Sequence, residues 1–592
     1  MAFDNLYTEL NSVSNDEFEN IMLVTPIETL LNTTIKKDIS RYTSKKDENT
    51  FVIEDNNGNE HDVFVKYITL VDFLKYLIGK YKNDNLSIMP CSSGSIENKG
   101  KYEQYINTIN NYAYVDGFFY YLTNNLKSRF NFVHGIRCFD HFVCQKKNCK
   151  INISDDLEYL CDSNYFIENM GKQFHFEDSN HTDIFKRVQQ DCVDIEYSDE
   201  NVSIILDDLN CELLDNNSRG TECTDKSVIS EPIKELVEMV EQEIQTNIIN
   251  NDSSDYKPLI VKNKQHNSES ENDSESENNS ESENNSVSEN NSVSENDSMS
   301  ENNSMSENDS MSENNSASDN NSASEDDSAS EDDSASEDDS EMILKISKIP
   351  AQVVVMEKCD KTFDSLLDTG DITIEELESA ICQIIITLYV YQKMFDFTHN
   401  DLHTNNIMYV ATEVPFIVYT IMGKIYKIPT FGKIYKIIDF GRSIYKFKGT
   451  LLCSDSFSIN GTAHTQYNFG PFLNPEKKQI EPNKSFDLCR LACSIFDFIC
   501  DDISKVDEYR TATPVYDLIF SWLYDDKGRN ILYKSNGDDK YPGFKLYKMI
   551  SRIVHNHLPE KQFDHKVFDK FIIHSFESEG DIIEIDVDSM EC

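Results

Sequence analysis

A tract of twelve consecutive six-residue units, residues 268–339, limits more than any other feature how this chain can fold. The units run from SESEND through SVSENN and SMSENN to SASEDD, and they contain no Lys, Arg or aromatic residue. Such a composition cannot bury enough apolar surface to offset the chain entropy lost on folding. We therefore expect residues 268–341 to be a disordered acidic spacer. A phosphorylated tract is the alternative, because the first serine of every unit has an acid three residues later.

The segment FTHNDLHTNNIM follows the tract and places Asp401 two residues after His399 and five before Asn406. Further on, IIDFGRSI places Asp439 at the end of an apolar run. Phosphoryl transfer needs a carboxylate near the attacking hydroxyl, and it needs amide and carboxylate oxygens for Mg²⁺. Either motif alone is common by chance. Their order and spacing, followed by FDLCRL with Asp487, favour a catalytic role.

Two alternating runs upstream, FVIE and HDVFVKYI, flank the turn NNGN and predict a β-hairpin. Lys66 lies inside the second run, where an ammonium group could hold phosphates. Such a lysine needs an acidic partner on the next helix, which the pattern predicts over residues 102–127. Asp116 in AYVDGFFYYLTNNL is our first choice for this partner, and Glu103 is the alternative.

The apolar run VVVME, followed by Lys358 and Cys359, predicts a strand that leads into a connecting segment. Its position before the catalytic motif makes the backbone groups of Glu357 and Cys359 candidates for pairing with adenine. Met356 would then border the base. The next segment, 375–396, has apolar residues at helical spacing and predicts a helix that leads to His399.

These motifs, together with NNYAYVDGFF, NFVHG, DDLEYL and FDLCRLACSIFD, resemble the divergent serine/threonine protein kinases of large nucleocytoplasmic DNA viruses. The resemblance covers residues 51 to about 180 and 345 to about 570. It implies an α+β, two-lobed protein-kinase-like fold, with ATP and Mg²⁺ as cofactors and protein Ser/Thr hydroxyls as acceptors. It also implies work in the cytoplasm of an infected host, with association with virions as a further option.

The resemblance assigns a role to each matching position. Asp401 would be the catalytic base, and Asn406 and Asp439 would bind the metal. Lys66, paired with Asp116, would hold the ATP phosphates.

Three departures from the family pattern keep other functions open. No glycine precedes Gly58, so the glycine-rich loop that covers phosphates is not visible. His403, which the resemblance places in the catalytic site, stands where most of these enzymes have a phosphate-binding lysine. A pseudokinase or scaffold is therefore one alternative. A small-molecule phosphotransferase is another, since D-L-H followed by N occurs there too, although Asp487 and a long activation segment oppose it.

The third departure is Asn400, where many protein kinases have an arginine that binds a phosphate on the activation segment. A neutral amide cannot neutralise such a phosphate. We therefore expect activity without phosphorylation of the activation segment, residues 442–474, and Arg442 is the nearby cation that could substitute. The hydroxyls concerned are Thr450, Ser454, Ser456, Ser458, Thr462 and Thr465.

In the predicted domain organisation, the acidic repeat is an insertion within the small lobe. In chain order this organisation comprises an N-terminal segment of unclear fold (1–50), the first part of the small lobe (51–143), a partly ordered insertion (144–267), the acidic repeat (268–341), the last small-lobe strand and hinge (345–360), the large lobe (361–575) and an acidic tail (576–592).

The net charge and the cysteines of the chain indicate which classes of partner and which cellular environment to expect. The chain has 54 Lys and Arg against 106 Asp and Glu, a net charge of −52, so we expect no direct nucleic-acid ligand. Neither a signal peptide nor an apolar run long enough for a membrane span is visible. We expect a soluble intracellular protein with reduced thiols. The spacing of the cysteines at 138, 144, 149 and 161 near His134 and His141 matches no known zinc module. The oligomeric state is left open.

Overall fold

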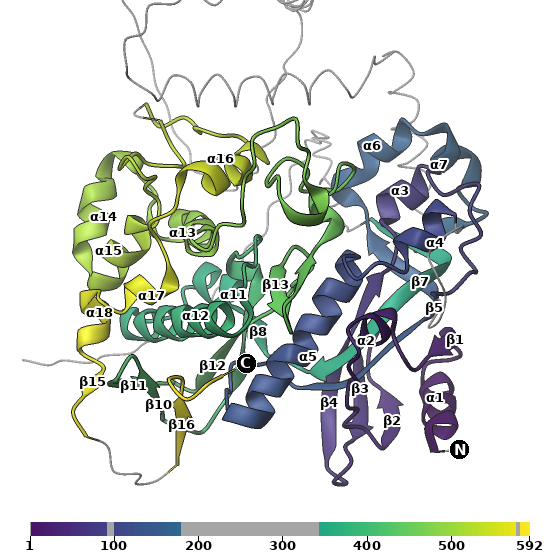
Figure 1. Ribbon diagram of the computed structural model, residues 1–592, viewed down its shortest axis with the longest axis horizontal. Coiled ribbons are helices and arrows are strands. Elements are labelled where there is room, and N and C mark those ends of the chain that lie inside the picture. The colour runs from purple at the N-terminus through teal and green to yellow at the C-terminus, as the bar shows by residue number, and fades with distance from the viewer. Residues whose placement is uncertain (1, 91–99, 179–341, 535, 576–580, 592) are drawn as a thin grey trace, which may run out of the picture. The chain divides into compact units, whose positions relative to one another are not determined.

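The computed structural model describes residues 2–90, 100–178, 342–534, 536–575 and 581–591, which form a mixed α+β structure (Figure 1). The predicted acidic repeat, 268–341, lies outside the described residues, as does most of the predicted insertion from 179 onward. The chain enters this part after β6 and leaves it just before β7, so the described segments before and after it meet in one sheet.

A curled antiparallel sheet of seven strands has the order β1-β5-β7-β4-β3-β2, and β6 also pairs with β7. β7, which comes last in the chain among the strands of this sheet, therefore lies between two earlier ones. β7 pairs with β4 on one side and with β5 on the other. The strands are β1 (Phe18–Met22), β2 (Arg41–Lys45), β3 (Thr50–Glu54), β4 (Glu60–Thr69), β5 (Cys138–Asn152), β6 (Phe174–Phe176) and β7 (Ile343–Glu357).

The predicted hairpin is confirmed. β3 and β4 pair from Thr50↔Phe64 to Glu54↔Glu60, and Gly58 takes the left-handed φ of +83° that the tight turn requires. Because side chains alternate along a strand, Val63 and Val65 face one side of the sheet while Lys66 faces the other. The valine side packs against the N-terminal helix α1 (Ala2–Val13) in one apolar cluster.

The other face of the sheet packs against α5 (Tyr112–Phe130), which contacts both β5 and β7. This helix starts at Asn111, whose side chain accepts a hydrogen bond from the Ala113 N–H, and ends at Asn131 with a left-handed φ of 53°. The shorter helices of this part are α2 (Pro26–Leu30), α3 (Phe73–Leu77), α4 (Lys101–Tyr105), α6 (Leu157–Cys161) and α7 (Asn164–Asn169).

The predicted helix 375–396 is confirmed as α12 (Ile374–Phe395), which is buried along most of its length. Thr373 and Glu376 form a capping box at its start, and Asp396 ends it with a φ of 52°. The other helices of this part are α11 (Phe363–Asp368), α13 (Phe486–Ile499), α14 (Val506–Ala512), α15 (Pro514–Ser521), α16 (Lys545–Ile553), α17 (Pro559–Gln562) and α18 (Lys566–Asp569).

Three small sheets accompany these helices. Their orders are β15-β11-β10-β16, β12-β9-β8 and β13-β14. The strands are β8 (Lys361–Thr362), β9 (Ile407–Ala411), β10 (Phe416–Ile421), β11 (Lys424–Pro429), β12 (Lys433–Ile437), β13 (Ile444–Phe447), β14 (Thr450–Cys453), β15 (Ile572–Ile573) and β16 (Ile582–Asp586). The hexapeptide GKIYKI occurs twice, at residues 423–428 and 432–437, and its two copies belong to different sheets, in β11 and β12.

Two predicted boundaries differ from the structure. The first part of the small lobe is predicted to end at residue 143, but β5 crosses this boundary and continues to Asn152, because the first half of β7 pairs with it as far as Ile343↔Asn152. The predicted acidic tail, 576–592, contains β16, which pairs in parallel with β10. Its acids alternate with the buried Ile585 and Val587, so the overall charge of the tail conceals a strand.

A helix that crosses a bilayer needs about 20 predominantly apolar residues. Among the helices of the described residues, none combines the length and the apolar character that a bilayer crossing needs.

Candidate active site

Lys66 lies where the large sheet meets α5 and the segment after β12. Its Nζ is 2.6 Å from Asp116 Oδ2 and 2.9 Å from Asp439 Oδ1. The structure therefore brings Lys66 to Asp116 on α5, whereas Glu103 lies on the separate helix α4. The side chain of Asp116 is buried, while that of Asp439 is 51% exposed.

The two carboxyl groups differ in their electrostatics. Burial raises the pKa of Asp116 to about 6, and the positive charge of Lys66 offsets part of that effect. The same positive charge lowers the pKa of Asp439 to about 2. At neutral pH Lys66 thus has two anionic partners, and the exposed one, Asp439, remains available to a metal ion.

Asp439 is held by its backbone as well as by Lys66. It adopts a left-handed φ of 64°, a conformation that Asp and Asn tolerate better than most residues. Its N–H donates to the Tyr120 hydroxyl at 2.9 Å, and the Phe440 N–H donates to Asp116 Oδ1 at 2.7 Å. Helix α5 therefore positions both the lysine and the backbone of the segment that carries Asp439.

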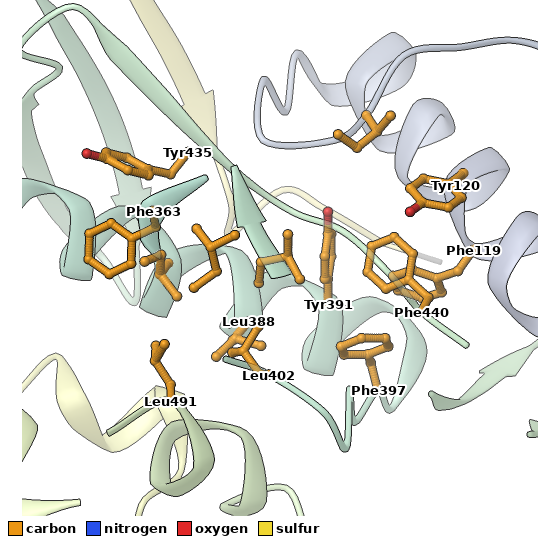
Figure 2. Packing of buried hydrophobic residues seen from close by; sticks show 14 of the residues in the cluster. Phe119, Tyr120, Phe363, Leu388, Tyr391, Phe397, Leu402, Tyr435, Phe440 and Leu491 are labelled. Atoms are coloured by element: carbon orange, nitrogen blue, oxygen red, sulfur yellow. The ribbon is translucent and has the colours of Figure 1, made fainter. Parts of the chain in front are cut away.

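Phe440 anchors this segment in the core. Its ring lies 4.6 Å from that of Phe119, 4.9 Å from Tyr120 and 5.7 Å from His399, measured between centroids. Figure 2 shows Phe119 and Tyr120 from α5 converging on Phe440, with Phe397 below them. Because Phe440 is buried, the neighbouring Asp439 is turned toward Lys66.

His399 links the catalytic loop to this aromatic group. Its Nε2 lies 2.9 Å from the Ile438 carbonyl, which can only accept, so Nε2 carries a proton. Nδ1 then accepts the Asp401 N–H at 3.3 Å. Burial lowers the pKa of His399, in agreement with a neutral ring.

Asp487 on α13 holds the loop from the other side. Its two carboxylate oxygens accept the N–H groups of His399 and Asn400, each at 2.9 Å. The side chain is fully buried, and burial raises the pKa of Asp487 to about 7. These contacts give Asp487 a structural role, because they fix the backbone of the loop that carries Asp401.

Removing that acceptor should destabilise the protein. Asp487→Ala leaves two buried N–H groups without a partner, so we expect the free energy of unfolding to fall by about 2–4 kcal/mol. Urea unfolding measures the change. Asp487→Asn retains one acceptor oxygen and should lose less, whereas an alanine variant with the wild-type midpoint would show that this carboxylate does not support the loop.

Asn406 presents one oxygen to the site. Its Nδ2 donates to the Asp401 carbonyl at 2.9 Å and lies 3.1 Å from His403 Nε2, so both amide hydrogens are used. Oδ1 is therefore the atom that Asn406 can offer a metal. The Ile438 N–H donates to the Asn406 carbonyl at 3.0 Å, which brings the residue beside Asp439. One amide oxygen and one exposed carboxylate fit Mg²⁺, which keeps most of its ligands from water and phosphate.

His403, which the resemblance places in the catalytic site, lies beside Asn406. Burial lowers the pKa of His403, and its Nε2 must accept from the Asn406 amide. The ring is thus a neutral acceptor at physiological pH and cannot replace a phosphate-binding lysine. It orients Asn406 instead.

Asp401 lies between two groups from other segments. Tyr547 on α16 donates its hydroxyl to Oδ1 at 2.8 Å, and Arg442 Nη1 lies 3.4 Å from Oδ2. Arg442, the cation that we considered for an activation-segment phosphate, is therefore already paired with the candidate base.

The predicted adenine-binding residues lie at the end of β7. Met356 is buried and pairs with Phe64 and Cys138 across the ladder. The Glu357 N–H already donates to the Arg137 carbonyl at 2.9 Å, so this donor is not available to adenine. Cys359 follows in the connection between β7 and β8 and is half-buried against the core.

The Glu357 side chain lies in a charged cluster. Its carboxylate lies 2.6 Å from Lys436 and 3.0 Å from Lys127. Burial opposes ionisation here, but the two lysines outweigh it and lower the pKa of Glu357 to about 2. This cluster connects β7, α5 and β12 by charge.

The turn between β2 and β3, residues 46–49, contains no glycine. The Val65 N–H donates to the Asn49 carbonyl at 2.7 Å, so the turn ends beside Lys66. Lys46 in this turn pairs with Asp62 at 2.6 Å. The hairpin is thus attached to β4 by its own contacts.

The cysteines near His134 and His141 do not form a metal centre among the described residues, where no group of three or more His, Cys, Asp or Glu is placed to hold an ion. His134 instead contacts the Tyr435 carbonyl at 2.7 Å and the Tyr419 hydroxyl at 2.6 Å. All four cysteines are buried thiols.

Sequence reasoning missed Tyr120, Tyr547 and Arg490 as components of the site. Tyr120 follows Asp116 by one helical turn and could have been found from that spacing. Tyr547 lies 146 residues after Asp401, and no local pattern connects the two.

No protein-family model matches this chain, and no curated protein matches it. The viral-kinase resemblance therefore stays a prediction from the motifs.

Proposed function

We propose that this chain is an ATP-dependent protein kinase that transfers phosphate to Ser/Thr hydroxyls of protein substrates. The observation that carries the proposal is the Lys66 ammonium group, bonded at once to Asp116 at 2.6 Å and to Asp439 at 2.9 Å. A lysine on a strand, an acid on a helix and an acid after an apolar strand form the constellation that phosphoryl transfer uses to hold phosphates and metal. In this proposal the seven-stranded sheet with α5 is the small lobe, and residues 361–575 are the large lobe.

Each residue of the candidate site would have a role that follows from its chemistry. ATP with Mg²⁺ supplies the phosphoryl group when bound. Lys66 would contact the phosphates, and Asn406 Oδ1 with the Asp439 carboxylate would hold the metal. Asp401 would accept a hydrogen bond from the attacking hydroxyl and take its proton.

A protein acceptor is favoured over a small molecule by the segment after Asp439. This segment forms the hairpin β13–β14 and then contacts the catalytic loop, where the Tyr467 hydroxyl donates to Asn400 Oδ1 at 2.7 Å. A long ordered segment beside the base offers a surface on which an extended peptide can lie.

The test is transfer of labelled phosphate from ATP to generic protein substrates, with Mg²⁺ and with a chelator. Label on protein serine or threonine, dependent on the metal, supports the proposal. Binding of ATP without any transfer would indicate a pseudokinase, and label on a small-molecule acceptor alone would indicate the third class of function.

Activity should not depend on phosphorylation of the activation segment. Buried Asn400 already binds Tyr467, and Asp455 ties the segment to α5 by accepting the Tyr112 N–H at 3.0 Å. Neither contact needs a phosphate. We expect phosphatase-treated enzyme to retain its transfer rate within about twofold.

Alanine variants complete this test. Ser454 is left intact because its hydroxyl donates to the Gly441 carbonyl at 2.6 Å. The remaining hydroxyls, Thr450, Ser456, Ser458, Thr462 and Thr465, are replaced together. Loss of activity on phosphatase treatment, reproduced by this variant, would show that a phosphate is required.

A further inference from the structure

Tyr547 connects the candidate base to a half-buried arginine. Its hydroxyl donates to Asp401 Oδ1 at 2.8 Å and accepts from Arg490 Nε at 2.9 Å. A guanidinium group that donates to the phenol oxygen polarises the O–H bond and strengthens its donation to a carboxylate. The three groups form one directed chain from α13 through α16 to the catalytic loop.

The phenol ring is held on several sides. It stacks on Phe544 with 5.4 Å between centroids and contacts Phe486 at 5.8 Å. The guanidinium carbons of Arg490 and Arg442 lie 5.2 Å and 5.8 Å from its centre, within the range of cation–π attraction. Rotation of the Tyr547 side chain would break all of these contacts.

Helix α16 is itself fixed at its C-terminal end. The Asn483 side chain donates to the carbonyls of Ile550 and Val554 at 3.2 Å and 2.6 Å. Arg552 donates from Nη2 to the Thr465 carbonyl at 2.7 Å. The position of the Tyr547 hydroxyl is therefore determined by well-anchored structure.

We propose that Tyr547 is a positioning residue that orients the Asp401 carboxylate, and that Arg490 orients Tyr547. The inference rests on the proposed kinase function. Asp401 has Tyr547 on one oxygen and Arg442 on the other, and each oxygen offers two acceptor directions. An incoming hydroxyl can therefore still bind, and it meets a carboxylate that no longer has to rotate into place.

Tyr547→Phe tests the proposal, because it removes one oxygen and retains the packed ring. We expect kcat to fall by about tenfold to a hundredfold, while the KM values for ATP and protein substrate change by less than about twofold. The melting temperature should stay near that of the wild type. Arg490→Met should also lower kcat. Because both residues act through one chain of hydrogen bonds, the kcat of the double variant should be only slightly below that of the less active single variant.

Tyr533→Phe is the matched control. The Tyr533 hydroxyl also donates to an aspartate, Asp497 Oδ1, at 3.2 Å, so the same chemical change is made away from Asp401. This variant should keep the wild-type kcat.

Three results would overturn the inference. The first is an unchanged kcat in Tyr547→Phe. The second is a raised kcat in this variant, which would mean that the phenol competes with the acceptor. The third is phosphate on Tyr547 of the wild-type protein after incubation with ATP and Mg²⁺, detected by mass spectrometry. Failure of the kinase proposal is distinguishable, because wild-type protein would then transfer no phosphate at all.

Discussion

Asp401→Asn should lower phosphate transfer by about a hundredfold or more and leave the fold intact. The amide has nearly the shape of the carboxylate and its oxygen can still accept from Tyr547, but it cannot take a proton from the acceptor. Its other group, an NH₂, faces Arg442, whose Nη1 lies 3.4 Å from Oδ2 in the native protein. Labelled-ATP transfer at saturating substrate measures the loss, and the urea midpoint verifies folding.

Asp517→Asn provides the matched control. This half-buried aspartate on α15 pairs with Arg510 at 3.0 Å and with Lys566 at 3.0 Å, so it is also a cation-bound carboxylate. It should retain wild-type transfer. Should Asp401→Asn keep most of its activity as well, Asp401 would not be the base and the assignment of the catalytic loop would be wrong.

Asp439→Asn should reduce transfer to a similar extent for a different reason. The change removes the anionic group that we propose as a metal ligand, and it removes one of the two acidic partners of Lys66, 2.9 Å away. We expect a loss of about a hundredfold or more. The Mg²⁺ concentration for half-maximal activity should also rise, whereas it should stay unchanged in Asp401→Asn. A magnesium titration of the two variants therefore separates the metal ligand from the base.

The backbone effect of this substitution is controlled by Asp396→Asn. Asp396 has a φ of 52°, close to the 64° of Asp439, and pairs with Lys446 at 2.7 Å. Asparagine tolerates this left-handed conformation as aspartate does, so both variants should fold. If Asp439→Asn showed wild-type magnesium dependence, its carboxylate would not bind the metal.

Short-range patterns predicted much of this structure. The alternation around NNGN predicted the hairpin of β3 and β4, and the helical spacing in 375–396 predicted α12 within one residue at each end. The spacing of Asp401 and Asn406 predicted two groups of one loop. These patterns succeed because strand alternation, turn geometry and helix periodicity depend on residues close together in the chain.

The acidic composition of the C-terminal segment conceals a strand. Residues 581–591 are rich in acids, yet Ile585, in the strand that pairs with β10, and Val587, directly after that strand, are buried. A charge count averages over a segment, whereas a strand needs only every second residue to be apolar. The same limit applies to β5, whose continuation to Asn152 required the partner strand β7 from beyond the acidic tract.

Local sequence patterns were enough to identify the chemical groups of the candidate site: the lysine on a strand, the candidate base and the amide on one loop, and the acid after an apolar run. Which of these groups meet depends on the packing of distant segments. This packing selected Asp116 over Glu103, turned His403 into a neutral partner of Asn406, and brought Tyr547 to Asp401. The physical reason is that closing a long loop costs little more than closing a short one. Sequence separation therefore gives almost no information on distant contacts, and the packing of Phe440, α5 and α16 decides them.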